Sequence, residues 1–224
     1  MKETGLMFKA PLVRGILEDL KTQTRRIAKL PHMNPLGEWE PTTVGGPGGG
    51  RTRDGKEVPL QVALGHTRTG DVICAPIQPG DRIYVRETFV QGYEEDPLTG
   101  RLKQWDEEGN DIPMTTWYRA TNGGITWSDD GESEANVPWK PAIHMPKSLA
   151  RIWLEVTGVR VERLQSISRG DAMAEGCPFP NMADGADPRK WFAEVWESTG
   201  GDWAANPWVW VIDFKRIEKP QAST

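Results

Sequence analysis

The chain has 224 residues, of which 37% are hydrophobic and 26% are charged, and its formal net charge is −5. This composition is that of a globular domain, and the acidic balance excludes a protein that binds long polyanions through overall positive charge. No apolar run reaches the roughly 18 residues of a membrane-spanning helix, and "MKETGLMFKA" has too short an apolar stretch for a signal peptide. We therefore expect one cytoplasmic domain, residues 1–224, with no membrane segment.

The cysteines and histidines are too scattered to indicate a metal site. Cys74 and Cys177 are far apart in the chain, and so are His32, His66 and His144. None of them has the paired spacing of zinc ligands. We expect inert or structural cysteines, no metal and no cofactor. The 11 tryptophans are the strongest oddity of the composition; they either pack the core or line a pocket for a flat ligand such as a base.

The first part of the chain reads as a strand, a helix and a long insertion. Residues 5–10 are typical of a short strand, and residues 10–21, "APLVRGILEDLK", have Pro11 in the first turn and apolar residues at helical spacing. Residues 31–80 include "GGPGGGRTRDGKEV" and show no apolar period. We expect a loop insertion there, outside the core, with room for one short hairpin.

The middle of the chain alternates strands with loops. "GDRIYVRETF" predicts a strand with one face formed by Ile83, Val85 and Glu87 and the other by Arg82, Tyr84 and Arg86. Residues 115–120, "TTWYRA", read as another strand, and residues 91–113 and 121–138 as acidic loop insertions. "RIWLEVTGVRVERL" is one long strand or a bent pair around Gly158.

Two helices and a strand complete the pattern. In "SRGDAMAEG", Ser168 is an N-cap and Gly176 a stop, which places Glu175 in the last turn of a short helix. "DPRKWFAEVWEST" has Asp187 as the cap of a second helix and Pro188 at its first position. "NPWVWVIDFKRI" is a final strand. Together these elements predict an α+β fold with a mixed sheet of five to seven strands and two or three helices.

Several motifs in the same order resemble the ASCH family of the PUA-like superfamily. They are "KTQTRR" after the first helix, "GDRIYVRET" on a middle strand, the "DAMAEG" helix and the closing "VWVIDF" strand. Together with "WKPAIHMPKSLARI" and "VERLQSIS", they are similar to ASCH proteins of phages and prophages. The resemblance implies a PUA-like half-open mixed β-barrel with a cleft beside the first helix. It also implies a link to RNA or modified nucleobases.

The first motif is similar to the "KTxTxR" pattern of the small bacterial N4-acetylcytidine amidohydrolases, which Lys21, Thr22, Thr24 and Arg26 match. In that branch the lysine and the second threonine act with a glutamate on a short helix after the central strands. By order and position this glutamate falls on Glu175. The resemblance therefore implies Lys21, Thr24 and Glu175 as catalytic residues, on a chain whose longer loops leave the substrate open.

The spacing of these residues requires a turn. Lys21 and Thr24 would point to opposite faces of a regular strand, because side chains alternate. If the helix ends near Lys21, then Thr22, Thr24 and Arg26 share one face and Lys21 reaches that face from the helix end. A threonine nucleophile needs a base, and a lysine serves only when its pKa is lowered. Neighbouring arginines lower that pKa, whereas an ionised Glu175 raises it, so the glutamate orients the threonine, takes its proton or protonates the leaving amine.

Each candidate also has a structural interpretation. "KTQTRR" is equally typical of a solvated turn at a helix end, where cations favour the dipole. Arg26, Arg86 and Glu87 are either ligand contacts, as Thr22 is also expected to be, or part of an internal Arg–Glu salt bridge. Trp139 and His144 either pack the core or contact a base. Tryptophans 208 and 210 favour the barrel core, and tryptophans 191 and 196 favour helix packing.

Three hypotheses follow for the function. The first is an amidohydrolase acting on an N-acylated pyrimidine nucleoside, with Thr24 as nucleophile, Lys21 as base and Glu175 as supporting acid or base. The second is a non-catalytic module that binds RNA, DNA or a modified nucleobase in the same cleft. The third is a phage accessory protein that binds a host protein. The acidic "YEEDP" and "SDDGESE" loops disfavour a long duplex, so a nucleoside, a single strand or a flipped base suits the charge better.

Overall fold

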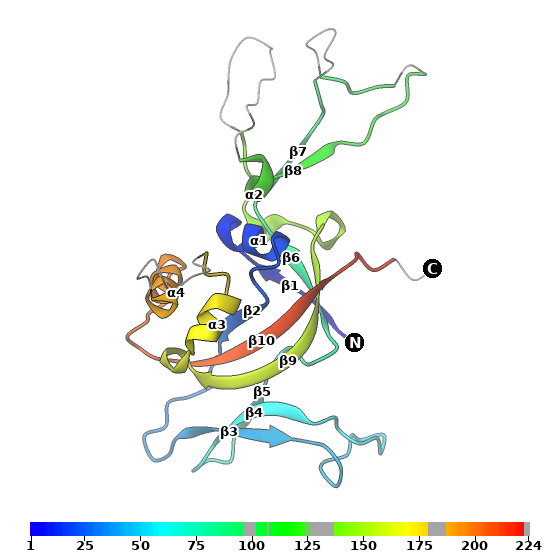
Figure 1. The fold of residues 1–224 in the computed structure, drawn as a ribbon. Coiled ribbons are helices and arrows are strands. Elements are labelled where there is room, and N and C mark those ends of the chain that lie inside the picture. The colour runs from blue at the N-terminus through cyan, green and yellow to red at the C-terminus, as the bar shows by residue number, and fades with distance from the viewer. Residues whose placement is uncertain (96–101, 107, 124, 126–136, 179–186, 222–224) are drawn as a thin grey trace.

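The computed structural model has an α+β fold built around one curved sheet (Figure 1). It describes residues 1–95, 102–106, 108–123, 125, 137–178 and 187–221. Within these residues there are ten strands and four α-helices. The α+β class predicted from the sequence is confirmed, and the strands and helices outnumber the five to seven and the two or three that were expected.

The central sheet has five strands in the order β1-β6-β9-β10-β2. β1 (Glu3–Met7) runs parallel to β6 (Arg82–Arg86), and every other pair is antiparallel, through β9 (Trp153–Arg163), β10 (Trp208–Ile217) and β2 (Gln23–Ile27). β1 and β2 are therefore the two edges, and the described strands form no closed barrel. The face predicted to hold Ile83, Val85 and Glu87 is the buried face of this segment, Glu87 included.

β9 is one long strand with a bulge against β10, which resolves the two interpretations of this segment. The pairing register shifts between Asp213 and Phe214, opposite Gly158 and Val156. A Cβ on Gly158 would lie 3.1 Å from Asp213 Oδ2, so this position requires glycine or a shift of the carboxylate. The bulge adds local twist, which helps the long β9–β10 pair to curve.

α1 (Ala10–Leu17) ends earlier than the sequence pattern predicts. Asp19 adopts a left-handed conformation with φ of 56°. The Gly15 carbonyl then accepts hydrogen bonds from the backbone N–H groups of Leu20, at 2.8 Å, and Lys21, at 2.9 Å. This turn satisfies the end of the helix and delivers Lys21 to the start of β2.

The other α-helices are α2 (Arg119–Asn122), α3 (Arg169–Ala174) and α4 (Pro188–Ser198). Ser168 caps α3 through a capping box with Asp171, and Asp187 caps α4, as the sequence predicts. Glu175 is the C-cap residue of α3, just after its last turn. None of the helices in the described ranges combines the length and apolarity needed to cross a membrane.

Residues 31–80 differ most from the expectation. They form a three-stranded antiparallel sheet of β3 (Trp39–Val44), β4 (Gln61–His66) and β5 (Val72–Cys74) below the central sheet (Figure 1). Leu64, which is 0% exposed, and the buried Ile77 belong to the main hydrophobic core. The prediction of a loop outside the core is therefore wrong. The apolar stretch of β4 is short and follows a glycine-rich segment, so it shows no apolar period in the sequence.

A hairpin of β7 (Phe89–Gly92) and β8 (Thr115–Tyr118) projects at the opposite end (Figure 1). The insertions predicted at residues 91–113 and 121–138 adjoin it, and much of the second lies outside the described residues. Single-turn 3-10 helices complete the structure: η1 (Ala142–His144), η2 (Lys147–Leu149) and η3 (Leu164–Ser166).

β10 separates two apolar clusters by the alternation of its side chains. Trp210 and Ile212 lie in the main core together with Val13 of α1. Val209 and Val211 lie in a second cluster with the aromatic residues of α4. Because β2 pairs with β10, its residues inherit the same two faces.

Candidate functional site

A cavity of about 740 Å³ lies along the edge strand β2, between the start of α1 and the end of α4. Three catalytic candidates, Lys21, Thr24 and Glu175, all line it. The rest of its wall comes from five segments: residues 7–9 with Leu12, residues 25–27 with Lys29, Thr88, Ala142, and α4 with the turn after it (Phe192, Val195, Trp196, Thr199, Gly200 and Gly201). Pockets of this size hold nucleoside-sized ligands.

The pairing of β2 shows which of its side chains share a face. Thr24 lies opposite Ile212, and Arg26 lies opposite Trp210, so both share the face of β2 that was predicted. Thr22 differs: it is exposed and does not line the cavity. Its backbone N–H donates to the Ala174 carbonyl, at 2.8 Å, which ties this residue to the end of α3.

Lys21 is buried, with 2% of its surface exposed, between two glycines. A Cβ on Gly15 would lie 3.4 Å from Lys21 Cβ, and one on Gly176, whose φ is 98°, would lie 3.1 Å from it. The missing side chains therefore make room for the lysine stem. Its ammonium donates to the Gln23 carbonyl at 2.8 Å, to the Glu175 carbonyl at 2.9 Å and to Glu175 Oε2 at 2.5 Å. These three acceptors use all three donors of an ammonium.

Glu175 joins two buried cations. Its Oε2 faces Lys21, and its Oε1 accepts from Arg25 Nη1 at 3.1 Å. The backbones of Lys21 and Glu175 also form an isolated β-bridge, so the ion pair is held at both backbone and side chain. Arg25 in turn donates to Glu162 Oε1 at 2.6 Å. Glu175 is buried and not in solvent. It contacts Lys21, so the glutamate and the lysine that the family resemblance implies are neighbours.

The surroundings of Lys21 lower its pKa. Burial is the main cause because it disfavours the charged ammonium, and the positive charges of Arg26 and Arg25 act in the same direction. The charge and the hydrogen bond of Glu175 raise the pKa, without cancelling the effect of burial. Lys21 is therefore more easily deprotonated than an exposed lysine, although its three acceptors favour the ammonium.

A network behind the cavity holds Arg25 and was not foreseen from the sequence. Gln23 Nε2 donates to Asp171 Oδ1 at 3.1 Å and to Asp213 Oδ1 at 2.6 Å. Burial opposes the ionisation of Asp171, but hydrogen bonds from Ser168 and Gln23 and the charges of arginines 160 and 25 outweigh it and lower its pKa to about 2. The network thus keeps the Asp171 carboxylate ionised at 3.5 Å from Arg25 and helps to fix its guanidinium.

The Thr24 hydroxyl is unengaged in this structure. Thr24 is buried, and within the described part of the chain no group forms a hydrogen bond with its side chain. Thr199, another threonine of the cavity wall, donates its hydroxyl to the Trp196 carbonyl at 2.6 Å. Thr24 is therefore the one of these two whose hydroxyl is available to a ligand.

Aromatic side chains form part of the cavity wall, which is one of the two roles that the sequence suggests for the tryptophans. Phe192 and Trp196 of α4 are buried in the second apolar cluster and also line the cavity. Packing was the predicted role of Trp196, and the cavity adds a second one. The Arg25 guanidinium lies 5.6 Å from the Phe192 ring centre, and that of Arg26 lies 5.0 Å from that of Phe8. A helical stripe does not show which neighbouring surface it will face.

The remaining predicted ligand contacts lie outside this cavity. Arg86 donates from Nε to the Met145 carbonyl at 3.1 Å and from Nη2 to the Ile143 carbonyl, and so it holds the η1 turn. Glu87 is buried and accepts from Arg151 at 2.9 and 3.0 Å. Trp139 is half-buried and His144 is exposed. The structure brings none of these four to the cavity, and Ala142 of η1 lines it instead.

The described residues contain no group of three or more His, Cys, Asp or Glu side chains that could hold a metal ion. Cys74 is exposed and Cys177 is buried, and both are free thiols. Comparisons with protein-family models, curated proteins and solved structures find no match to this chain.

Proposed function

We propose that this protein is an amidohydrolase that acts on an N-acylated pyrimidine nucleoside of the N4-acetylcytidine type. The observation that carries the proposal is the buried Lys21–Glu175 ion pair, which lines the same cavity as the unengaged hydroxyl of Thr24. These are the three residues that the family resemblance implies: Lys21 lies just before β2, Thr24 lies within β2, and Glu175 is the C-cap residue of α3.

A PUA-like half-open barrel is the fold that goes with this proposal. The curvature of the five-stranded sheet brings its edges near each other, because Arg26 Nη2 of β2 donates to the Met7 carbonyl of β1 at 3.0 Å. The cavity lies beside α1, where the resemblance to the ASCH family implies a cleft.

The hydrogen bonds of Lys21 favour Glu175 as the group that accepts and then donates the proton. Lys21 in its ammonium form holds three protons on three acceptors, so it has no lone pair for the Thr24 proton. In the proposed reaction Thr24 Oγ1 attacks the acyl carbonyl carbon, and its proton passes to the Glu175 carboxylate. The protonated Glu175 then donates to the leaving amine as the carbon–nitrogen bond breaks.

A water molecule completes the reaction. It attacks the acyl ester on Thr24, releases the carboxylic acid and returns a proton to the threonine oxygen, so amide and water become amine and acid. The ammonium of Lys21 supplies positive charge near the developing oxyanion, where burial makes it more effective than in water. Phe192 and Trp196 offer apolar surface to the base.

The test is a panel of N-acylated nucleosides, incubated with purified full-length protein and analysed by mass spectrometry. We expect N4-acetylcytidine or a close analogue to lose its acyl group, and Lys21→Ala and Thr24→Ala each to abolish turnover. Thr42→Val is the matched control, since Thr42 is an exposed strand threonine outside the cavity. Turnover that survives in Thr24→Ala would contradict the assignment of the nucleophile.

A non-catalytic module that binds RNA, DNA or a modified nucleobase in this cavity is the second candidate. The missing hydrogen bond between Thr24 and a base favours it, because an activated nucleophile usually has one. If wild-type protein binds the panel without cleaving any member, the enzyme proposal fails and the binding function stands.

A further inference from the structure

The cavity is strongly cationic on a chain with a net charge of −5. One carboxylate, Glu175, lines it, against five basic side chains: Lys9, Lys21, Arg25, Arg26 and Lys29. A cavity of the opposite sign to the whole protein attracts anions locally while the rest of the surface repels long polyanions. Its charge therefore bears on which small ligand it takes.

Two of the five cations are neutralised by carboxylates. Lys21 pairs with Glu175 at 2.5 Å. Arg25 pairs with Glu162 at 2.6 Å, and Glu162 lies outside the cavity wall. The excess positive charge thus belongs to Arg26, Lys29 and Lys9, for which no carboxylate partner occurs among the described residues.

Arg26 points a partly used guanidinium at the cavity. Its Nη2 donates to the Met7 carbonyl, and its plane lies over the Phe8 ring. Nε is buried without a hydrogen-bond partner, so no ligand reaches it, whereas Nη1 is not buried and also has no partner in the part of the chain that the structure describes. Burial lowers the pKa of Arg26, and the negative charge of Glu175 raises it by a smaller amount. A guanidinium nevertheless stays charged at neutral pH. A half-buried cation with spare donors suits an anionic ligand.

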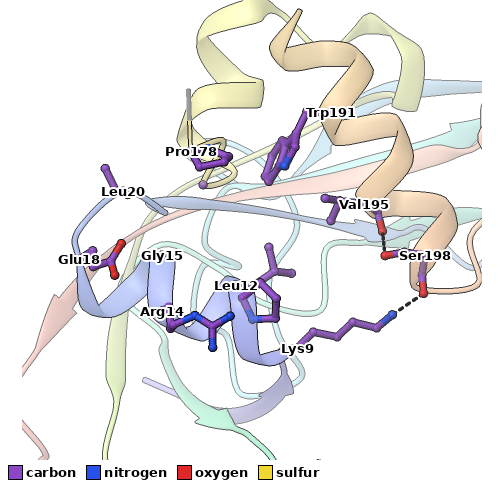
Figure 2. Close-up of a pocket in the computed structure, with 12 residues that line it drawn as sticks. Lys9, Leu12, Arg14, Gly15, Glu18, Leu20, Pro178, Trp191, Val195 and Ser198 are labelled. Carbon is purple, nitrogen blue, oxygen red and sulfur yellow. Dashed lines mark hydrogen bonds between the residues drawn. The ribbon is translucent and has the colours of Figure 1, made fainter. Parts of the chain in front are cut away.

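The two lysines differ in how free they are. Lys9 donates to the Ser198 carbonyl, which joins the start of α1 to the end of α4 (Figure 2). It stands there with Leu12 and Val195 between the large cavity and a second one of about 300 Å³. Lys29 is exposed and has no partner among the described residues. Lys29 therefore remains available to a ligand at the cavity mouth.

We propose that the substrate of this site is a nucleotide, with a phosphate bound by Arg26 and Lys29, and not a free nucleoside. Its base would lie toward Thr24 and the aromatic residues of α4. This inference rests on the proposed function for the base, and on the cation excess alone for the phosphate. The phosphate belongs either to a mononucleotide, which the size of the cavity favours, or to a nucleic-acid chain.

The test compares the binding of cytidine and of cytidine 5′-monophosphate to the full-length protein by titration calorimetry. One charge-assisted contact predicts that the monophosphate binds about 10- to 100-fold more tightly at low ionic strength. This ratio is expected to shrink as salt screens the exposed Lys29. Equal affinities for the two ligands, without tighter binding of a short cytidine-containing RNA, would overturn the proposal.

Two variants keep the test specific. Lys29→Gln removes an exposed cation without disturbing the core, and it should lower the monophosphate-to-cytidine affinity ratio several-fold. Lys56→Gln, at an exposed lysine in the loop between β3 and β4, should leave the ratio unchanged. An unchanged ratio in both Lys29→Gln and Arg26→Gln would overturn the assignment of the two residues.

Further ligands distinguish the source of the phosphate and the status of the proposed function. Tight binding of a short cytidine-containing RNA, with no gain for the monophosphate, would overturn the mononucleotide. Hydrolysis of N4-acetylcytidine as fast as that of its 5′-monophosphate would overturn this inference and leave the amidohydrolase standing. A phosphate-dependent gain in binding without any hydrolysis would support the phosphate site and reject the amidohydrolase.

Discussion

Replacing Glu175 by glutamine should destabilise the fold as well as the site. The substitution leaves Lys21, which is 2% exposed, and the buried Arg25 without the carboxylate between them. Each lost hydrogen bond to a charged group is worth about 1.5–3 kcal/mol, and breaking a buried ion pair from one side costs about 3–5 kcal/mol. We expect the free energy of unfolding to fall by about 3–5 kcal/mol, which corresponds to roughly 10 °C in Tm for a chain of this size.

Urea denaturation of wild type, Glu175→Gln and Glu175→Leu/Lys21→Met measures this effect. The double variant replaces the pair by apolar groups and should recover most of the loss, since Arg25 keeps Glu162. Glu175 raises the pKa of Lys21, so Glu175→Gln lowers that pKa further. In this variant the unfolded lysine binds more protons than the folded one, so the stability of the variant rises with pH relative to wild type. The loss in the free energy of unfolding should therefore be greater at about pH 6 than at about pH 9. A loss below about 1 kcal/mol at both pH values would refute the buried pair.

Three further predictions concern the charges of the site. If Lys21 acts as an ammonium, kcat should fall as the pH rises through its lowered pKa, below 10.5, whereas a lysine base would make kcat rise over that range. Asp171 has a folded pKa of about 2 against an ordinary 3.8, so its contribution to stability should be lost as the pH falls through that interval, and acid titration of Asp171→Asn should lack this loss. Arg25→Lys should lower the unfolding free energy by about 2 kcal/mol in urea, because lysine lacks the fork that joins Glu162 and Glu175; an unchanged value would contradict the network.

Local patterns predicted the elements of this fold well, because they depend on neighbours in the sequence. The caps at Ser168 and Asp187 and the bend at Gly158 follow from single residues whose chemistry allows few alternatives. The end of α1 was misplaced because Leu20 continues the apolar spacing, while the left-handed Asp19 breaks the helix before it. Competition between a periodic pattern and a local turn cannot be decided from spacing alone.

The pairing of Lys21 with Glu175 could be predicted, but the residues that form the cavity wall could not. Lys21 and Glu175 could be placed together only through the family resemblance, because 154 residues separate them in the chain. The role of Arg25 as the second partner of Glu175 depends on the register of β2 against β10, which no spacing reveals. Trp196 lines the cavity because of the way α4 packs, whereas Arg86 lies outside it because it binds the η1 turn.

The sheet formed by β3, β4 and β5 has a consequence for engineering this chain. Removing residues 31–80 to obtain a minimal domain would remove Leu64 and Ile77 and expose the core surface that they cover, and should give an insoluble product. The connection between β3 and β4 is a different matter, since nearly all of residues 47–60 are exposed. A peptide tag or a fluorescent label belongs there, since none of these residues lines the cavity.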